Sequence, residues 1–307
     1  MKRTGFISIV GRPNVGKSTL LNSILGDHIA IVSSKPQTTR NRIAGIETRG
    51  EDQFVFLDTP GIFQPKNSLG DFMVKTANSA MQDGDAVILV ADVGFEPGDV
   101  EKNVIKYLKQ SETPAILALN KVDLCRREQI AATIAAYAAL HDFFAVVPIS
   151  AKKGKYVDEL MDECAKLLHE GEWFYDEDMI TDQPQRQMAA EIIREKILRT
   201  LDKEIPHGVA VVIEEYREED GLVRIRAEIY CEKASHKGIL VGKNGETLKR
   251  IGSYARDDLE KMLDCKVYLN LWVKVKENWR DSQRGILNFG SHNKFSSCIL
   301  FFIVHHS

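Results

Sequence analysis

The stretch Gly11-Arg12-Pro13-Asn14-Val15-Gly16-Lys17-Ser18 decides the fold of this 307-residue chain, because it fits the pattern G-x-x-x-x-G-K-[ST]. The apolar run Phe6–Val10 before it predicts a buried strand, and Thr19–Leu25 after it carries apolar residues at helical spacing. In that context the backbone N–H groups of the loop and of the helix N-terminus cradle phosphate oxygens. Lys17 would reach the β- and γ-phosphates, and the Ser18 hydroxyl would bind Mg²⁺. We therefore expect Gly11 to Thr19 to bind the phosphates of a nucleotide.

Short apolar strands and helical stretches alternate through the first half of the chain. The further strands that we predict are Phe54–Leu57, Ala86–Val90, Ala115–Leu119 and Ala145–Ile149. Strands that alternate with helices form a mostly parallel α/β sheet with helices flanking it. Each predicted strand ends where a polar or glycine-rich loop begins, and ligands bind at that edge of the sheet in open α/β folds.

The segment Asp58-Thr59-Pro60-Gly61 follows the strand Phe54–Leu57 and fits the pattern D-x-x-G. Behind a phosphate loop, Asp58 would support Mg²⁺ and the N–H of Gly61 would meet the γ-phosphate. Taken alone, the same four residues are typical of a turn after a strand. Their interpretation as part of a nucleotide site therefore depends on the loop upstream.

Two later strand ends identify the base. Asn120-Lys121-Val122-Asp123 follows one strand, and the Asp123 carboxylate can accept hydrogen bonds from N1–H and the 2-amino group of guanine. Adenine has neither donor there, so a buried carboxylate would be left unpaired and would reject it. Ser150-Ala151-Lys152 closes the last strand and would place a backbone N–H on guanine O6. The sequence thus predicts a site for GTP and GDP.

The pattern changes after Leu168. Residues 169–185 are polar and acidic and contain Pro184, which indicates a linker. The elements predicted beyond it are Met188–Leu201, Val209–Glu215, Leu222–Cys231, Glu246–Leu263 and Lys266–Lys276, with a glycine-rich stretch in their middle. We divide the chain into a nucleotide-binding domain (1–170), a linker (171–185), a small α+β domain of order α-β-β-α-α-β (186–290) and a C-terminal tail (291–307).

A basic segment lies in this second domain, although the net charge of the chain is −3. Lys233 to Lys294 contain 13 basic and 7 acidic residues, which indicates either a polyanion site or an ordinary solvated face. Gly242-Lys243-Asn244-Gly245 lies between two helical stretches of this segment, and three further basic residues are near it: Lys237, Lys249 and Arg250. Glycines let a sugar-phosphate backbone approach closely, and the following helix offers its N-terminus. The alternative is a structural turn, because turns often produce G-x-x-G.

Composition and cysteine spacing exclude several classes of protein. Hydrophobic residues make up 44% and charged residues 28%, which argues against a disordered or collagen-like chain. The five cysteines are an odd number without any C-x-x-C, which argues against a disulfide framework and a zinc site. The apolar run before Gly11 is too short for a signal peptide, and Cys298–Val304 is too short to span a bilayer. We therefore expect a cytoplasmic protein with reduced thiols.

Together, the nucleotide motifs resemble those of the translation-factor class of GTPases, and the second domain resembles a type II KH domain, which clamps single-stranded RNA. A P-loop GTPase domain followed by such a domain is similar to the Era family of bacterial GTPases, as are Ile180–Arg186, Glu191–Lys196 and Leu271–Lys276. The resemblance covers about residues 5–290. It implies GTP hydrolysis with Lys17, Thr39 and Gly61 in catalytic roles.

The resemblance also implies a switch loop at Pro36–Arg40, in which Thr39, or alternatively Thr38, binds Mg²⁺ and the γ-phosphate. The implied Mg²⁺ ligands are thus Ser18, Thr39 and Asp58. Ile62 stands where Ras-like proteins have the glutamine that orients water, so slow intrinsic hydrolysis is expected. In relatives of this class the asparagine at the position of Asn14 coordinates a monovalent cation such as K⁺; otherwise Asn14 only shapes the loop.

The implied partners are the 3′ region of 16S rRNA and the small ribosomal subunit, bound by a monomer, with weak peripheral association at the inner membrane. RNA contacts would come from Lys237, Gly242 to Gly245, Lys249 and Arg250. Two other functions stay open: a hydrolase whose C-terminal domain binds only proteins, and a membrane-associated signalling GTPase. The latter rests on Ser291–Ser307, which departs from the family and is a lineage extension, a membrane-touching segment, or an unpacked or artefactual end.

Overall fold

The computed structural model describes residues 1–33, 35, 37–201 and 208–286. Contacts divide the chain into two compact units, residues 1–65 with 70–184, and residues 66–69 with 185 onward. The tail Ser291–Ser307 lies outside the described residues. In the part of the chain that the structure describes, no helix is both long enough and apolar enough to cross a membrane.

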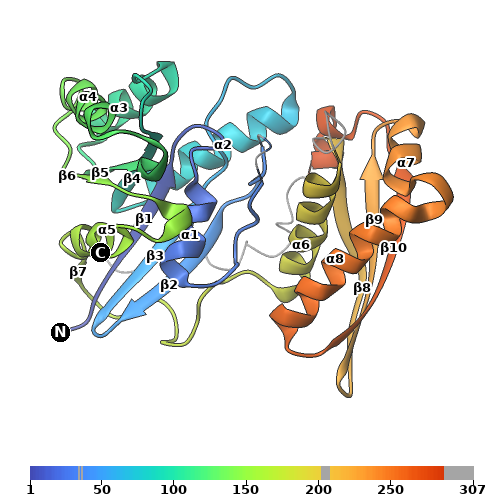
Figure 1. Cartoon of the computed structure of the whole chain (residues 1–307). Coiled ribbons are helices and arrows are strands. Elements are labelled where there is room, and N and C mark those ends of the chain that lie inside the picture. The colour runs from blue at the N-terminus through green and yellow to red at the C-terminus, as the bar shows by residue number, and fades with distance from the viewer. Residues whose placement is uncertain (34, 36, 202–207, 287–307) are drawn as a thin grey trace. The chain divides into compact units, whose positions relative to one another are not determined.

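The first unit is built on one twisted sheet with the strand order β2-β3-β1-β4-β5-β6, in which β7 also pairs with β1 (Figure 1). The strands are β1 (Arg3–Val10), β2 (Ile43–Arg49), β3 (Asp52–Asp58), β4 (Ala86–Asp92), β5 (Ala115–Asn120), β6 (Ala145–Pro148) and β7 (His169–Glu170). β2 runs antiparallel to β3 and β7 antiparallel to β1, and the other pairs are parallel. The expected mostly parallel sheet is confirmed, although β2 and β7 were not predicted.

Helices pack against this sheet and bury its central strands. They are α1 (Lys17–Leu25), α2 (Ser68–Asp83), α3 (Asp99–Ser111), α4 (Arg127–Ala138) and α5 (Val157–Ala165), with short 3₁₀ turns η1 (Val122–Leu124) and η2 (Ala151–Lys153). Residues 86–91 of β4 and all of β5 are buried, which explains their uninterrupted apolar sequence. The carboxyl ends of β1, β3, β5 and β6 therefore bring the four predicted nucleotide motifs to one edge of the sheet.

The second unit has a three-stranded sheet of order β10-β9-β8. Its elements are α6 (Gln185–Thr200), β8 (Ala210–Glu219), β9 (Leu222–Cys231), α7 (Ala234–Val241), η4 (Lys243–Gly245), α8 (Glu246–Leu263), β10 (Lys266–Val275), η5 (Trp279–Asp281) and α9 (Gln283–Gly285). α6 and α8 cover one face of the sheet, where a buried core includes Ile197, Ile225 and Leu259 (Figure 1). The order α-β-β-α-α-β agrees with the expectation from the sequence.

Residues 171–184, which the sequence predicts to be a linker, belong to the first unit. The Trp173 indole N–H donates to the carbonyl of Glu51 (3.1 Å), and the N–H groups of Phe174 and Tyr175 donate to Oε1 of Gln53. An aromatic contact also packs this segment against β1: the ring centroids of Phe174 and Phe6 lie 4.7 Å apart. Acidic residues on both sides of the run Trp173–Tyr175 conceal this packing in the sequence.

Candidate nucleotide site and RNA interface

The phosphate loop joins β1 to α1 and needs glycine at its two ends. Gly11 and Gly16 have φ angles of 149° and 99°, which L side chains rarely adopt. A Cβ at Gly11 would collide with the carbonyl of Val90, and one at Gly16 would collide with the side chain of Asn120. The loop therefore lies directly on β4 and β5, and its backbone follows a fixed path into α1.

The Lys17 side chain is buried inside this loop. Its Nζ donates to the carbonyls of Gly11 (3.3 Å) and Arg12 (2.9 Å). Burial lowers the pKa of Lys17 to about 8. Lys17 and Gly61 line one pocket, of about 400 Å³ of empty volume, with Asn14, Ser18, Thr19 and Thr39. A cationic group inside a backbone loop is suited to bind phosphate.

Three oxygen-bearing side chains meet beside Lys17. The Ser18 hydroxyl donates to Oδ2 of Asp58 (2.6 Å) and lies 2.8 Å from Oγ1 of Thr39. Thr38 also lines the pocket, but its hydroxyl donates to the carbonyl of Lys35 (2.6 Å). Among the described residues, Oδ1 of the buried Asp58 finds no hydrogen-bond partner, and burial raises the pKa of this carboxyl to about 6. Two hydroxyls and a carboxylate are the oxygen donors that Mg²⁺ prefers, so the set fits this ion.

The segment after β3 packs against the phosphate loop. The N–H of Ile62 donates to the carbonyl of Gly11 (3.0 Å), and the hydroxyl of Thr59 donates to the carbonyl of Ile9 (2.8 Å). A Cβ at Gly61 would lie 2.7 Å from the backbone of Pro13, so glycine allows this close approach. Asp58, Thr59, Pro60 and Gly61 thus lie together with the loop, as the motif predicts.

Asn120 connects three loops on the side of the site where the base is expected to bind. Its Nδ2 donates to the carbonyl of Val15 (2.8 Å), and its Oδ1 accepts from the N–H groups of Lys121 (2.8 Å) and Ala151 (3.0 Å). Asn120 is buried, so these bonds are shielded from water. The phosphate loop and the segments after β5 and β6 are therefore held in one arrangement.

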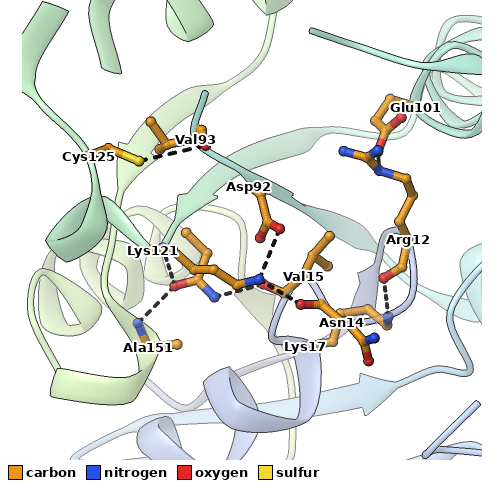
Figure 2. A network of polar contacts seen from close by, with 11 residues as sticks. Arg12, Asn14, Val15, Lys17, Asp92, Val93, Glu101, Lys121, Cys125 and Ala151 are labelled. Carbon is orange, nitrogen blue, oxygen red and sulfur yellow. Dashed lines mark hydrogen bonds and ion pairs between the residues drawn. The ribbon is translucent and has the colours of Figure 1, made fainter. Parts of the chain in front are cut away.

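Lys121 and Asp123 both have partners that the sequence did not indicate. Lys121 Nζ donates to the carbonyl of Asn14 (2.8 Å) and to Oδ2 of Asp92 (2.9 Å), at the end of β4 (Figure 2). Asp123 accepts from the Ser150 hydroxyl (2.7 Å) and pairs with Lys153, and the hydrogen bond from Ser150 holds the pKa of Asp123 below its usual value. The Asp123 carboxylate is therefore ionised, and each of its oxygens has a partner in this structure. An acidic residue at a strand end was the available signal for Asp92.

Two predicted nucleotide residues, Arg12 and Lys152, do not line the pocket around Lys17. The Arg12 side chain forms an ion pair with the buried Glu101 of α3 (2.5 Å) and lies 5.8 Å from the ring centroid of Phe95. Figure 2 shows it directed away from Lys17. Its contribution inside the loop is the backbone carbonyl that Lys17 contacts. Lys152 is exposed in η2, beside Ala151.

In the second unit, the G-x-x-G segment forms a tight turn between α7 and α8. Gly242 has φ 75° and Gly245 has φ 78°, and Asn244 has φ 51°. A Cβ at Gly242 would lie 2.9 Å from the backbone N of Thr247, whereas at Gly245 it would meet nothing within 4 Å. The four predicted basic residues are all exposed near this turn: Lys237, Lys243, Lys249 and Arg250.

A groove of about 980 Å³ of empty volume begins beside Gly245 and runs between α8 and β10. Its lining combines apolar residues, Leu248, Leu269 and Leu271, with the basic residues Lys249 and Arg256. Apolar walls accept bases and basic side chains accept phosphates, which suits single-stranded RNA. Arg256 and Tyr268 complete this lining and were missed, because only the folded chain brings α8 to β10.

Comparisons with known proteins agree with both parts of the chain. Residues 6–121 match the family described as 50S ribosome-binding GTPase, and residues 204–280 match the KH domain. The chain is 50% identical to the GTPase Era of Ruminiclostridium cellulolyticum over 94% of its own length and 97% of that protein. It is 50% identical to the GTPase Era of Clostridioides difficile over 96% and 100%, respectively.

Two crystal structures share the whole architecture. One is Era in complex with MgGDPNP and nucleotides 1506–1542 of 16S ribosomal RNA, with a TM-score of 0.91, 38% identity and coverage of 94% of this chain and 99% of that one. The other is a variant of Aquifex aeolicus Era bound to GDP·AlF₄⁻, with a TM-score of 0.91, 39% identity and the same coverage. The chain therefore belongs to the Era family of GTPases, and it hydrolyses GTP.

Proposed function

We propose that this GTPase binds the single-stranded 3′ region of 16S rRNA through its KH domain and acts in maturation of the small ribosomal subunit. The observation that carries the proposal is the basic G-x-x-G turn at the mouth of an apolar groove, in a chain that also builds a guanine-nucleotide site. The relative crystallised with both MgGDPNP and a 16S rRNA segment supports it.

The geometry of the site supports a proposed part for each nucleotide-binding group. Lys17 would exchange its two carbonyl contacts for the β- and γ-phosphate oxygens, and the loop N–H groups would hold the remaining ones. Ser18, Thr39 and Asp58 would hold Mg²⁺, which neutralises phosphate charge when bound. Asp123 would select guanine through its two acceptor oxygens.

Hydrolysis would be slow because Ile62 cannot orient the attacking water. Thr39 and Gly61 come from different segments that line the same pocket. Both residues would contact the γ-phosphate, so the bound γ-phosphate would hold the two segments together. Loss of the γ-phosphate releases both segments. We therefore propose that GTP favours the RNA-binding state of the chain.

Asn14 lines the same pocket, and we propose it as a ligand for K⁺ near the phosphates. If so, GTP hydrolysis in KCl should exceed hydrolysis in NaCl at equal ionic strength, and Asn14→Ala should remove the difference. A cytoplasmic location, a monomeric state and weak peripheral membrane association are further predictions of the family resemblance. Sedimentation and cell fractionation of the full chain test them.

A filter-binding titration at fixed salt tests the proposed function, because phosphate contacts make RNA affinity depend on salt. The probes are the 3′ end of 16S rRNA and a scrambled RNA, each with protein loaded with GDP or a non-hydrolysable GTP analogue. Selective binding that is tighter with the GTP analogue supports both RNA recognition and the switch. Equal affinity in the two states would contradict the switch, and weak binding to both RNAs would favour a C-terminal domain that binds proteins.

A further inference from the structure

A second groove lies on the first unit and shares no lining residue with the nucleotide pocket. Its empty volume is about 830 Å³, within the size range of ligand sites. Its lining combines three aromatic and three acidic side chains: Trp173, Phe174, Tyr175, Glu172, Asp176 and Glu177. Nucleotide binding uses none of these residues, so the groove requires a separate explanation.

A buried residue holds the aromatic wall of this groove in place. Gln53 of β3 is fully buried, and its Oε1 accepts from the N–H groups of Phe174 (2.9 Å) and Tyr175 (3.1 Å). Its Nε2 donates to the carbonyl of Tyr175 (2.9 Å). The Trp173 indole is fixed in turn by its hydrogen bond to the carbonyl of Glu51. The groove is therefore preorganised, and a ligand would not have to order it.

A cation of the chain itself shows which chemistry the groove accepts. The Nζ of Lys2 lies 4.2 Å from the centroid of the Trp173 ring and 3.8 Å from Oε2 of Glu172. An ammonium is attracted by both an aromatic face and a carboxylate. The Lys2 side chain is 46% exposed, so water reaches it and a competing cation could take its place.

The charge of the groove is only partly compensated. Residues 170–178 contain five acidic residues and no Lys or Arg. In the described part of the chain, Lys2 is the one cation that lines the groove, and neither Asp176 nor Glu177 forms an ion pair. Three lining carboxylates against one ammonium leave a net charge of −2. The groove therefore favours a ligand with more than one positive charge.

We propose that this groove binds the extended, Lys- and Arg-rich arm of a nucleic-acid-binding protein. Basic arms of this kind are common interaction segments. Their cationic heads would pair with Asp176 and Glu177, while their methylene stems would lie along the rings of Trp173 and Phe174. RNA and anionic lipid are disfavoured, because the same carboxylates repel phosphate. The proposal does not depend on RNA binding by the second unit.

Fluorescence anisotropy on the full chain loaded with GDP tests the proposal. The probes are labelled peptides of about ten residues, one alternating Arg with Ser and the other alternating Gln with Ser. The arginine peptide should bind at least about ten-fold more tightly. Asp176→Asn combined with Glu177→Gln should weaken its binding about five-fold or more. The matched control is Glu128→Gln combined with Asp162→Asn, which removes the same charge from exposed positions on α4 and α5 and should change binding less than about two-fold.

Two further variants separate the aromatic contact from general charge attraction. Trp173→Ala should weaken binding of the arginine peptide about three-fold or more, and Trp173→Phe should weaken it less because a π face remains. Lys2→Gln should strengthen binding about two-fold or more, since the Trp173 ring and Glu172 then become available to the peptide. A gain in affinity cannot result from partial unfolding. GTP hydrolysis should be unchanged in each variant, because the two lining sets are separate.

Three outcomes would overturn the proposal. If the arginine and glutamine peptides bind equally, the groove does not select cations. If both double variants weaken binding to the same extent, the peptide responds to the charge of the whole chain and not to the groove. If Trp173→Ala leaves peptide binding unchanged but weakens binding of a single-stranded RNA, the groove binds nucleic acid. None of these results contradicts the proposed function, which the filter-binding titration tests independently.

Discussion

Asn120 is the residue whose removal should disturb the nucleotide site most. In Asn120→Ala, the carbonyl of Val15 and the N–H of Ala151 lose their partner, and both residues are nearly fully buried. A buried backbone group without a partner costs about 1–3 kcal/mol, so the first unit should lose about 2–5 kcal/mol of unfolding free energy. That loss is a large fraction of the stability of a typical domain.

Native-state hydrogen exchange measures this loss on the first unit alone. Amide protection in β4 and β5 should fall about 30-fold or more in Asn120→Ala, and GDP affinity should fall with it because three loops lose their connection. Asn103→Ala is the control, since Asn103 is exposed on α3 and its removal should change stability by less than about 0.5 kcal/mol. Protection within about two-fold of the parent chain, with GDP affinity retained, would refute the reasoning.

Four other substitutions probe three separate parts of the chain. Asp123→Asn should lower GTP affinity about 10- to 100-fold in a calorimetric titration, because a charged acceptor for two guanine donors is lost, and an unchanged affinity would contradict the base assignment. Glu101→Gln should lower the unfolding free energy of the first unit by about 1–2 kcal/mol, measured from the urea midpoint. This value is kept low because Arg12 is partly exposed and water screens the ion pair. A change below about 0.3 kcal/mol would show that the ion pair does not stabilise the unit. Gly242→Ala should weaken RNA binding more than Gly245→Ala, because only the first adds a collision to the strain of a positive φ; filter binding with equal losses would count against this distinction.

The nucleotide motifs could be predicted because each is a short stretch with its own chemistry at the end of a strand. The sequence orders Gly11, Asp58, Asn120 and Ser150 along the chain, and the topology of a parallel sheet then brings strand ends together. The structure also places Thr39, rather than Thr38, beside Ser18. Local pattern alone could not separate the two threonines, since both lie in the same polar loop.

β2 was missed because of its own sequence pattern, whereas the Arg12–Glu101 ion pair depends on a contact between distant segments. β2 is an edge strand that pairs with β3 through a turn at Gly50, and Gly45 interrupts its apolar pattern, although Gly50 itself was a usable hairpin signal. Glu101 is exceptional as a fully buried carboxylate in a helix that otherwise shows an ordinary amphipathic pattern. Only the fold reveals that Arg12 lies beside it.

The hydrogen bonds along β2 also have a consequence for how the chain is synthesised. Ile46 N–H donates to the carbonyl of Ile180, and the Thr181 hydroxyl donates to the carbonyl of Ala44, so residues 180–181 cover the open side of this edge strand. An uncovered edge can pair with another chain. We expect a fragment of residues 1–170 to self-associate in light scattering, and a fragment of residues 1–184 to stay dispersed.

During translation, β2 is synthesised long before residues 180–181, which pair with its open edge. Roughly 7 to 26 seconds separate the synthesis of β2 from that of Thr181 at about 5–20 residues per second. Nascent chains on neighbouring ribosomes of one message could pair through β2 in that interval. Aggregation through β2 is therefore possible from the time β2 and β3 leave the ribosome until residues 180–181 pair with β2.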